Sequence, residues 1–339
     1  MLYGWMLIGS GYGVQTWEES TARLVDGARL IFIPIIIYYV RDGLVSKGVM
    51  SAFMTAMGVT LIAGMMKMYL NVPIGLKYTE AAVFKTHIAT NFFMVLGAFY
   101  VAFFAFRIKA YRWPLIILAM AMIYYVFFMS LGRIGYLAAF VLGLYTAYTF
   151  YGKKAFFLSL LALMLLGSML YIFSEVFQVR MDHLLRDWLY YEQNRISESS
   201  LGSRLQFDLA SIQLFLKHPL LGWGTGSFET AYQSFVAIGH LPTDNPHNEF
   251  LRVGVEHGLI GLALLGYMVF KQWQLFKNLP NDFQFLAKGS LLLFLVGCFF
   301  NSWLMDFTES YYYVLMTAMS LSTVKLLQPG DLVTARLHS

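Results

Sequence analysis

The chain has 339 residues, of which 58% are hydrophobic and only 13% are charged, whereas an ordinary soluble domain is roughly 25% charged. Its net charge of +5 is scattered through short loops, without the concentrated basic face of a nucleic-acid-binding protein. The one cysteine, Cys298, lies in an apolar run, which excludes an intrachain disulfide and a thiolate-rich zinc or iron–sulfur centre. The composition therefore predicts a membrane protein.

Apolar segments long enough to cross hydrocarbon recur along the chain. The expected spans are residues 24–40, 48–70, 90–106, 114–131, 134–151, 155–173, 250–275, 285–304 and 310–327. Residues 1–16 look like part of a further helix, without the basic start or cleavage site of a signal peptide. We expect an all-α polytopic fold with about 9–12 transmembrane helices, forming a single membrane domain over residues 1–339.

Short loops that carry lysine and arginine are expected on the cytoplasmic side. These loops are residues 41–47, 107–113, 152–154 and 271–288, together with the C-terminal tail. Alternation then places residues 71–89, the Arg133 turn, 174–249 and 305–309 outside. Residues 174–249 are predicted to form a periplasmic loop inserted between transmembrane helices, containing short amphipathic helices that lie on the membrane.

This orientation leaves an excess of cations at the outer boundary. They are Lys77, Lys85, Arg133, Arg180, Arg186, Arg195, Arg204, Lys217 and Arg252. Long loops escape the charge rule, but Lys85 and Arg133 lie outside the long loop. Cations beside the outer leaflet predict an anionic ligand such as a lipid phosphate or pyrophosphate. The alternatives are that Arg133 snorkels and that Arg204 pairs with Asp208 on its own helix.

The segment 203–219 predicts an amphipathic helix with an N-cap at Ser203 and a stop at Pro219. Its expected apolar face carries Leu205, Leu209, Ile212 and Phe215 or Leu216, and its polar stripe carries Arg204, Asp208 and Ser211. The following "GWGTGSF" (222–228) predicts a tight turn, because a nucleotide-binding glycine loop requires a preceding strand.

The stretch "TDNPHNEFLR" (243–252) concentrates polar residues at the start of an apolar segment. Asp244 or Asn245 is expected to cap a helix with Pro246 at its first position, which places His247 in the first turn. A helix N-terminus favours anions and a neutral imidazole, and a neutral imidazole can act as a general base. The alternative is an interfacial histidine that starts a helix without chemistry.

Several residues between 249 and 310 are expected to have structural roles and not catalytic ones. Gly254 and Gly258 form a small-xxx-small pair that predicts close packing on another helix. Glu249, Arg252 and Glu256 form a charged stripe in which opposite charges are expected to satisfy one another. The acids of "MDFTES" (305–310), Asp306 and Glu309, are expected to be solvated.

Three motifs occur in a fixed order: "SLGRIG" (130–135), "SRLQFDLASIQLFLKHPLLGWGTGSFE" (203–229) and "NPHNEFLRVGVEHGLIG" (245–261). Together they resemble the O-antigen ligase and polymerase superfamily of bacterial inner-membrane proteins, most closely the O-antigen ligase, over about residues 120–265. The resemblance implies a metal-independent glycosyltransferase that needs no cofactor. Such an enzyme moves a glycan from undecaprenyl pyrophosphate to lipid A-core oligosaccharide in lipopolysaccharide biosynthesis.

The same resemblance implies roles for particular residues and a location. By motif, Arg133 and Arg204 would bind the pyrophosphate and His247 would activate the acceptor hydroxyl. Lys85 joins the pyrophosphate-binding group because its loop precedes a helix on the same face. The expected location is the inner (cytoplasmic) membrane with the active site facing the periplasm, and the expected partners are the lipid-linked donor, the acceptor and membrane lipids, with no nucleic acid.

Other functions remain open at this point. An O-antigen polymerase or a protein O-oligosaccharyltransferase of the same superfamily would differ in the acceptor. A lipid or glycan transporter, which belongs to another class, predicts charged or broken helices at mid-membrane in corresponding halves of the chain. The ionisable residues gather instead at one boundary, which favours the transferase over the transporter and over a scaffold.

Overall fold

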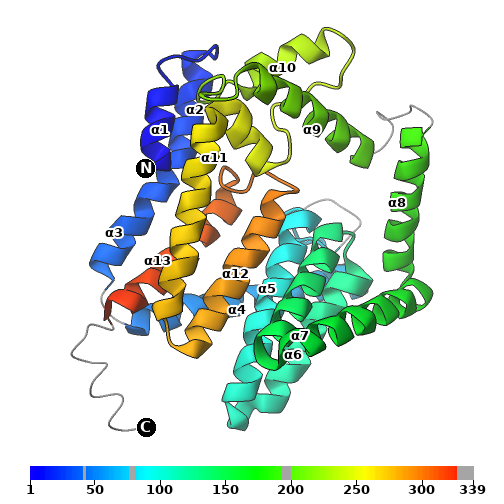
Figure 1. Ribbon diagram of the computed structural model, residues 1–339. Coiled ribbons are helices and arrows are strands. Elements are labelled where there is room, and N and C mark those ends of the chain that lie inside the picture. The colour runs from blue at the N-terminus through cyan, green and yellow to red at the C-terminus, as the bar shows by residue number, and fades with distance from the viewer. Residues whose placement is uncertain (41–42, 76–80, 193–199, 327–339) are drawn as a thin grey trace. The chain divides into compact units, whose positions relative to one another are not determined.

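A computed structural model describes residues 1–40, 43–75, 81–192 and 200–326, and over these residues it is helical with no strand (Figure 1). The all-α expectation is therefore confirmed. The chain folds into two compact units: unit 1 comprises Met1–Gly43 and Arg186–Ser339, and unit 2 comprises Leu44–Leu185. Lys77 and Arg195, two of the cations expected at the outer boundary, and the C-terminal tail, which is expected on the cytoplasmic side, lie outside the described residues.

Unit 2 is built from long apolar helices. They are α4 (Gly43–Tyr69), α5 (His87–Arg107), α6 (Arg112–Tyr124) with a π-helical extension (Tyr125–Met129), α7 (Arg133–Phe173) and the first part of α8 (Glu175–Glu192). Gly152 has φ +76° and interrupts α7, so this one element contains both segments expected at 134–151 and 155–173. Only glycine adopts such a conformation without strain.

Unit 1 brings together the two ends of the chain. Its helices are α1 (Leu2–Gly9), α2 (Trp17–Ala28), α3 (Phe32–Tyr39), α9 (Ser200–Lys217), α10 (Phe228–Val236), α11 (Glu249–Leu275), α12 (Asn281–Cys298) and α13 (Phe307–Leu326). In this unit α13 packs against α3, α11 and α12 (Figure 1). The N-terminal helices are thereby part of the same core as the C-terminal ones.

Five segments among the described residues are long and apolar enough to cross a membrane. They are Lys47–Tyr69, His87–Arg107, Lys109–Met129, Arg133–Phe173 and Glu249–Asn278. The segments expected at 24–40, 285–304 and 310–327 also contain helices, but these are not among the five. A multi-pass helical membrane protein therefore follows from the structure as well as from the sequence.

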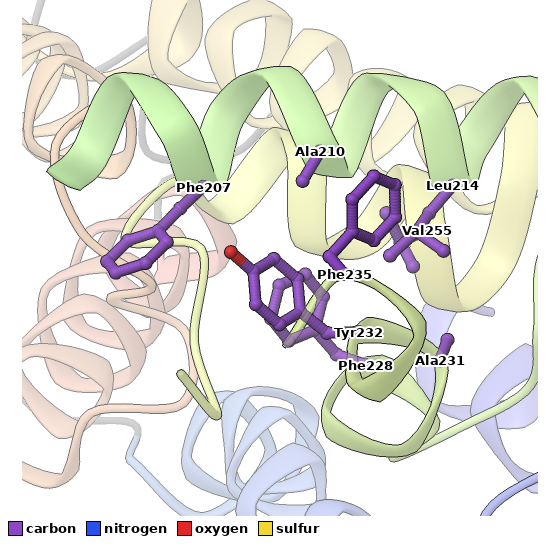
Figure 2. Close-up of a cluster of buried hydrophobic side chains, with 8 residues drawn as sticks. All are labelled: Phe207, Ala210, Leu214, Phe228, Ala231, Tyr232, Phe235 and Val255. Atoms are coloured by element: carbon purple, nitrogen blue, oxygen red, sulfur yellow. The ribbon is translucent and has the colours of Figure 1, made fainter. Parts of the chain in front are cut away.

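Helix α9 is anchored by one apolar face. The buried cluster contains Phe207, Ala210 and Leu214 of α9, Phe228, Ala231, Tyr232 and Phe235 of α10, and Val255 of α11 (Figure 2). Complete burial of a phenylalanine, leucine or valine side chain contributes about 1.5–3 kcal/mol. The cluster therefore fixes α9 on α10 and on the beginning of α11.

The sequence interpretation of α9 is corrected in three respects. Ser203 is not an N-cap, because the helix already runs at Ser200. Ser211 is not on an exposed polar stripe, since it is fully buried and its hydroxyl donates to the Phe207 carbonyl at 2.6 Å. The apolar face expected from the sequence includes Leu209 and Leu216, and both are exposed. Helix α9 thus has a buried apolar face and an exposed one.

Gly258 divides α11 into two helical pieces. Its φ of +62° and ψ of −160° are not helical, and a Cβ at this position would clash with the Leu220 carbonyl. The small-xxx-small interpretation is therefore wrong for Gly258, whose role is to break the helix. Gly254 lies beside Phe215 of α9, but a Cβ there would be in ordinary contact with its ring, at 3.4 Å, so this packing does not require glycine.

The glycine-rich loop after α9 fills the break in α11. The N–H groups of Trp223 and Gly224 donate to the Val255 and Glu256 carbonyls at 2.8 and 2.9 Å, and Leu259 N–H donates to the Pro219 carbonyl at 2.8 Å. The glycines at 222, 224 and 226 all have positive φ. The tight-turn interpretation of this cluster is confirmed, and the turn satisfies backbone groups that the broken helix leaves free.

Helix α12 ends at Cys298, six residues before the expected end of the apolar segment. Trp303 is fully buried and folds back over Gly297, where a Cβ would clash with the indole ring. Residues 299–306 consequently form a turn, with hydrogen bonds from Phe300 N–H to the Gly297 carbonyl and from Asp306 N–H to the Ser302 carbonyl. This turn carries polar residues to the start of α11.

Candidate functional site

His247 lies in a strained turn immediately before α11. Its φ is +57°, which is uncommon for a residue with a side chain and costs on the order of 1–3 kcal/mol. The Asn245 Oδ1 atom accepts the His247 N–H at 2.9 Å and the Ser302 hydroxyl at 2.6 Å, and these bonds hold the turn. Strain that the surroundings maintain in this way is typical of functional sites.

The expected helix start at Pro246 is wrong. Helix α11 begins at Glu249, and its N-cap is Asn248, whose Oδ1 accepts the N–H groups of Phe250 and Leu251 at 3.1 and 3.2 Å. His247 therefore precedes the cap and is not in the first turn. The Asn245 side chain cannot cap the helix because it closes the turn around His247 instead.

The imidazole of His247 is half-buried between two elements of unit 1. Its Nδ1 lies 3.1 Å from Oδ1 of Asn301, and its ring centroid lies 6.2 Å from that of Phe207 on α9. The Asn301 Nδ2 donates to Oδ2 of Asp306 at 2.8 Å. Solvated acids were expected here, but Asp306 is half-buried and bonded, and Glu309 is only 3% exposed.

A buried ion pair connects the start of α11 to the 299–306 turn. Arg252 Nη2 donates to Glu249 Oε1 at 2.7 Å, and both side chains are inaccessible to solvent. The second oxygen of Glu249 accepts the backbone N–H of Leu304 at 2.9 Å. The structural interpretation of this stripe is confirmed for Glu249 and Arg252, and the pair connects the start of α11 to the 299–306 turn. Glu256 lies 3.8 Å from Arg23 of α2.

Arg204 lies on α9, one turn before Phe207, so the buried cluster holds it in the same unit as His247. Burial raises the pKa of the Asp208 carboxyl to about 6, and the positive charge of Arg204 acts in the opposite direction. The electrostatic partnership between Arg204 and Asp208 that the sequence suggests is therefore present. Asp208 also has a buried Oδ1 without a hydrogen-bond partner.

Arg133 and Lys85 belong to unit 2, and the structure brings them to the same edge of it. Arg133 is the first residue of α7, directly after Gly132. The Asn91 side chain donates to the Gly132 carbonyl at 2.9 Å, and a Cβ at Gly132 would lie 2.6 Å from the His87 carbonyl. The start of α5, two residues after Lys85, therefore packs against the turn that carries Arg133.

A third cation of unit 2 lies at this turn. Arg180 of α8 donates through Nε to the Leu131 carbonyl at 2.6 Å, and its Nη1 lies 3.5 Å from Nδ1 of His183. Arg180 is one of the cations expected in the long loop, but no sequence pattern distinguishes it from the others. Its proximity to Leu131 depends on a contact between residues 49 positions apart, which no local pattern predicts.

Within the described part of the chain, no group of three or more His, Cys, Asp or Glu side chains is arranged to hold a metal ion. The polar groups gathered at His247 are an imidazole, amides, hydroxyls and one carboxylate. These groups can donate, accept and transfer protons.

Residues 117–266 match the protein-family model described as O-Antigen ligase. This match supports membership of the O-antigen ligase superfamily. The matched region of this ligase-family domain contains Arg133, Arg204 and His247, whereas Lys85, Asn301 and Asp306 lie outside it. The matched family suggests a glycosyltransferase-like membrane enzyme with lipid-linked glycan substrates. None of the curated proteins compared with the chain matches it.

Proposed function

We propose that the protein is an O-antigen ligase-like glycosyltransferase that moves a glycan from undecaprenyl pyrophosphate to lipid A-core oligosaccharide. In this proposal the site faces the periplasm and the protein lies in the inner membrane of a bacterium. The observation that carries the proposal is His247, which lies within the matched region in a strained turn held by side-chain hydrogen bonds. A positioned imidazole of this kind is suited to general-base catalysis.

The proposed reaction is a single displacement. His247 takes the proton of the acceptor hydroxyl while the hydroxyl oxygen forms a bond to the anomeric carbon of the donor. The bond between that carbon and the pyrophosphate oxygen breaks, and its electron pair leaves with the pyrophosphate. The proton on His247 then passes to solvent.

The leaving group needs stabilisation of its negative charge. We assign this role to Arg204 of unit 1 and to Arg133 and Lys85 of unit 2, as pyrophosphate-binding residues. Charge-assisted hydrogen bonds from arginine and lysine to phosphate oxygens supply it without a metal ion or cofactor. Pyrophosphate is a good leaving group, so this stabilisation accounts for a large part of the expected rate.

The acceptor distinguishes the ligase from its relatives in the superfamily. A growing glycan would make the protein a polymerase, and a protein hydroxyl would make it a protein O-oligosaccharyltransferase. The modest length of the 174–249 loop favours a lipid-linked acceptor over a docked protein.

The transporter alternative predicts broken helices, and α11 is broken at Gly258. In a transporter, the free backbone groups at such a break face a ligand. Here the Val255 and Glu256 carbonyls are already bonded to the N–H groups of Trp223 and Gly224. The break is therefore filled by the chain itself, which favours a structural role over transport.

The decisive experiment is transfer of a glycan from its undecaprenyl-pyrophosphate carrier to purified lipid A-core by the detergent-solubilised protein, with a chelator present. His247→Ala is the test variant, and His218→Ala, which changes an exposed histidine of the same domain, is the control. We expect product from the wild type and from His218→Ala, and none from folded His247→Ala.

Three outcomes contradict parts of the proposal. Full activity of His247→Ala would contradict the role of His247 as general base. Loss of wild-type product on addition of the chelator would contradict the metal-independent mechanism. Folded wild-type protein that transfers no glycan to lipid A-core removes the ligase assignment, and a growing glycan and protein acceptors then become the acceptors to test.

A further inference from the structure

The side chain of Asn301 lies between the imidazole of His247 and the carboxylate of Asp306. We propose that Asn301 and Asp306 are positioning residues that hold His247 as the Nδ1–H tautomer, with Nε2 free to accept the proton of the acceptor. This inference rests on the proposed function. It extends the site to residues outside the region that matches the ligase family.

The tautomer follows from the hydrogen-bonding capacity of each group. A carboxylate only accepts hydrogen bonds, so the amide group of Asn301 must direct its Nδ2 to Asp306, at 2.8 Å. The amide oxygen then faces His247, at 3.1 Å from Nδ1, and this oxygen also only accepts. The imidazole nitrogen facing Asn301 must therefore carry the hydrogen, which leaves the lone pair on Nε2.

The amide of Asn301 is held rigidly enough to impose this choice. Residues that follow it in sequence are bonded to the His247 turn and to α11: the Ser302 hydroxyl donates to Asn245, and Leu304 N–H donates to Glu249. Trp303 is buried against Gly297 between them. The 299–306 turn and the His247 turn therefore form one hydrogen-bonded assembly.

A fixed tautomer matters for the proposed reaction. If the hydrogen were on Nε2, the nitrogen facing the acceptor would be a donor and could not remove a proton. Loss of the orienting amide should lower kcat by about 10- to 100-fold, less than the roughly 10²–10⁴-fold that a general base itself supplies. Both polar atoms of this amide are bonded to His247 and Asp306, and its proposed role is to orient the base, so KM should not change.

Two variants test the inference. Asn301→Ala removes the amide, and the double variant Asn301→Asp/Asp306→Asn exchanges the two groups. In the exchanged pair, the carboxylate at position 301 accepts from His247 Nδ1–H and from the new amide at position 306, so each hydrogen bond is restored. We expect Asn301→Ala to lose kcat at unchanged KM, and the exchange variant to recover most of it.

A second readout does not depend on activity. Nitrogen-15 NMR of histidine-labelled protein, with the His247 signals assigned by their absence in His247→Ala, reports which ring nitrogen carries the hydrogen. We expect the Nδ1–H form in the wild type and in the exchange variant, and a mixture of tautomers in Asn301→Ala. A purely structural role for Asn301 would lower the amount of folded protein without changing the tautomer of the folded fraction.

The inference is overturned if folded Asn301→Ala retains wild-type kcat, if its His247 remains the Nδ1–H tautomer, or if the exchange variant is as slow as Asn301→Ala. Failure of the proposed function looks different. In that case the wild type transfers no glycan to any acceptor, while the NMR measurement still decides whether Asn301 sets the tautomer.

Discussion

Replacing Gly258 by alanine tests whether the break in α11 is a required feature of the fold. The φ of +62° and ψ of −160° at this position lie in a region that residues with a Cβ avoid. The added Cβ would clash with the Leu220 carbonyl and lie 2.8 Å from the backbone nitrogen of Gly222. Both neighbours are backbone atoms, so the loop that fills the break must shift.

The magnitude has two contributions. Holding alanine in this conformation costs about 1–3 kcal/mol, and the overpacking against the loop costs about 1–3 kcal/mol more. Gly258→Ala should therefore destabilise the protein by about 2–6 kcal/mol. Gly266, in the second piece of α11, is the matched control, because its backbone is helical and no atom lies within 4 Å of an added Cβ. Gly266→Ala should be neutral or stabilising by about 0.5–1 kcal/mol.

The assay is the apparent Tm of the two variants in one detergent, followed by tryptophan fluorescence. We expect a clear decrease for Gly258→Ala and none for Gly266→Ala. Equal Tm values for the two variants would refute the reasoning, because they would show that the chain adopts a continuous α11 without penalty. Glycan transfer should also decrease in Gly258→Ala, since the break fixes one end of the helix that follows His247.

Three further predictions concern stability, and each is measured by thermal unfolding in detergent. Leu214→Ala removes a completely buried side chain and should cost about 2–5 kcal/mol, whereas Leu216→Ala on the exposed face of the same helix should cost less than about 0.5 kcal/mol; equal costs would show that the exposed face is covered. Glu249→Gln leaves Arg252 buried without its counter-charge and should cost about 3–5 kcal/mol, much of which a second change of Arg252→Met should restore; additive losses would contradict this. Burial raises the pKa of Asp208 from 3.8 to about 6, so the folded state binds this proton more tightly than the unfolded state. Its stabilising contribution is complete below about pH 4 and is lost as the pH rises through about 6. The wild type should therefore lose stability relative to Asp208→Asn over this interval, and a relative gain would contradict the burial argument.

Much of the fold follows from local patterns. Apolar length predicts the spanning helices of unit 2, because hydrocarbon thickness sets it. Glycine content predicts the tight turn at 222–228, because three of its residues need positive φ. The spacing of Glu249 and Arg252 predicts their pairing, because residues three apart are neighbours on a helix.

The parts of the site that sequence reasoning missed depend on contacts between distant residues. Residues 299–304 are apolar enough to extend a membrane helix, yet the packing of Trp303 on Gly297 turns the chain there. Pro246 suits the first position of a helix, but the Asn245 side chain bonds to His247 and to Ser302, 57 residues away, and moves the helix start to Glu249. Local sequence propensity predicts neither the packing of Trp303 on Gly297 nor the bond between Asn245 and Ser302.

The first piece of α11 is anchored at both ends, and this explains how a strained histidine can be kept in place. At one end, the Glu249 carboxylate joins Arg252 to the Leu304 backbone. At the other end, the carbonyls before Gly258 are bonded to the glycine-rich loop. These anchors are buried, so water cannot readily compete for their hydrogen bonds and salt screens them little. The short piece therefore acts as a rigid support for His247, and the 299–306 turn and the glycine-rich loop hold its two ends.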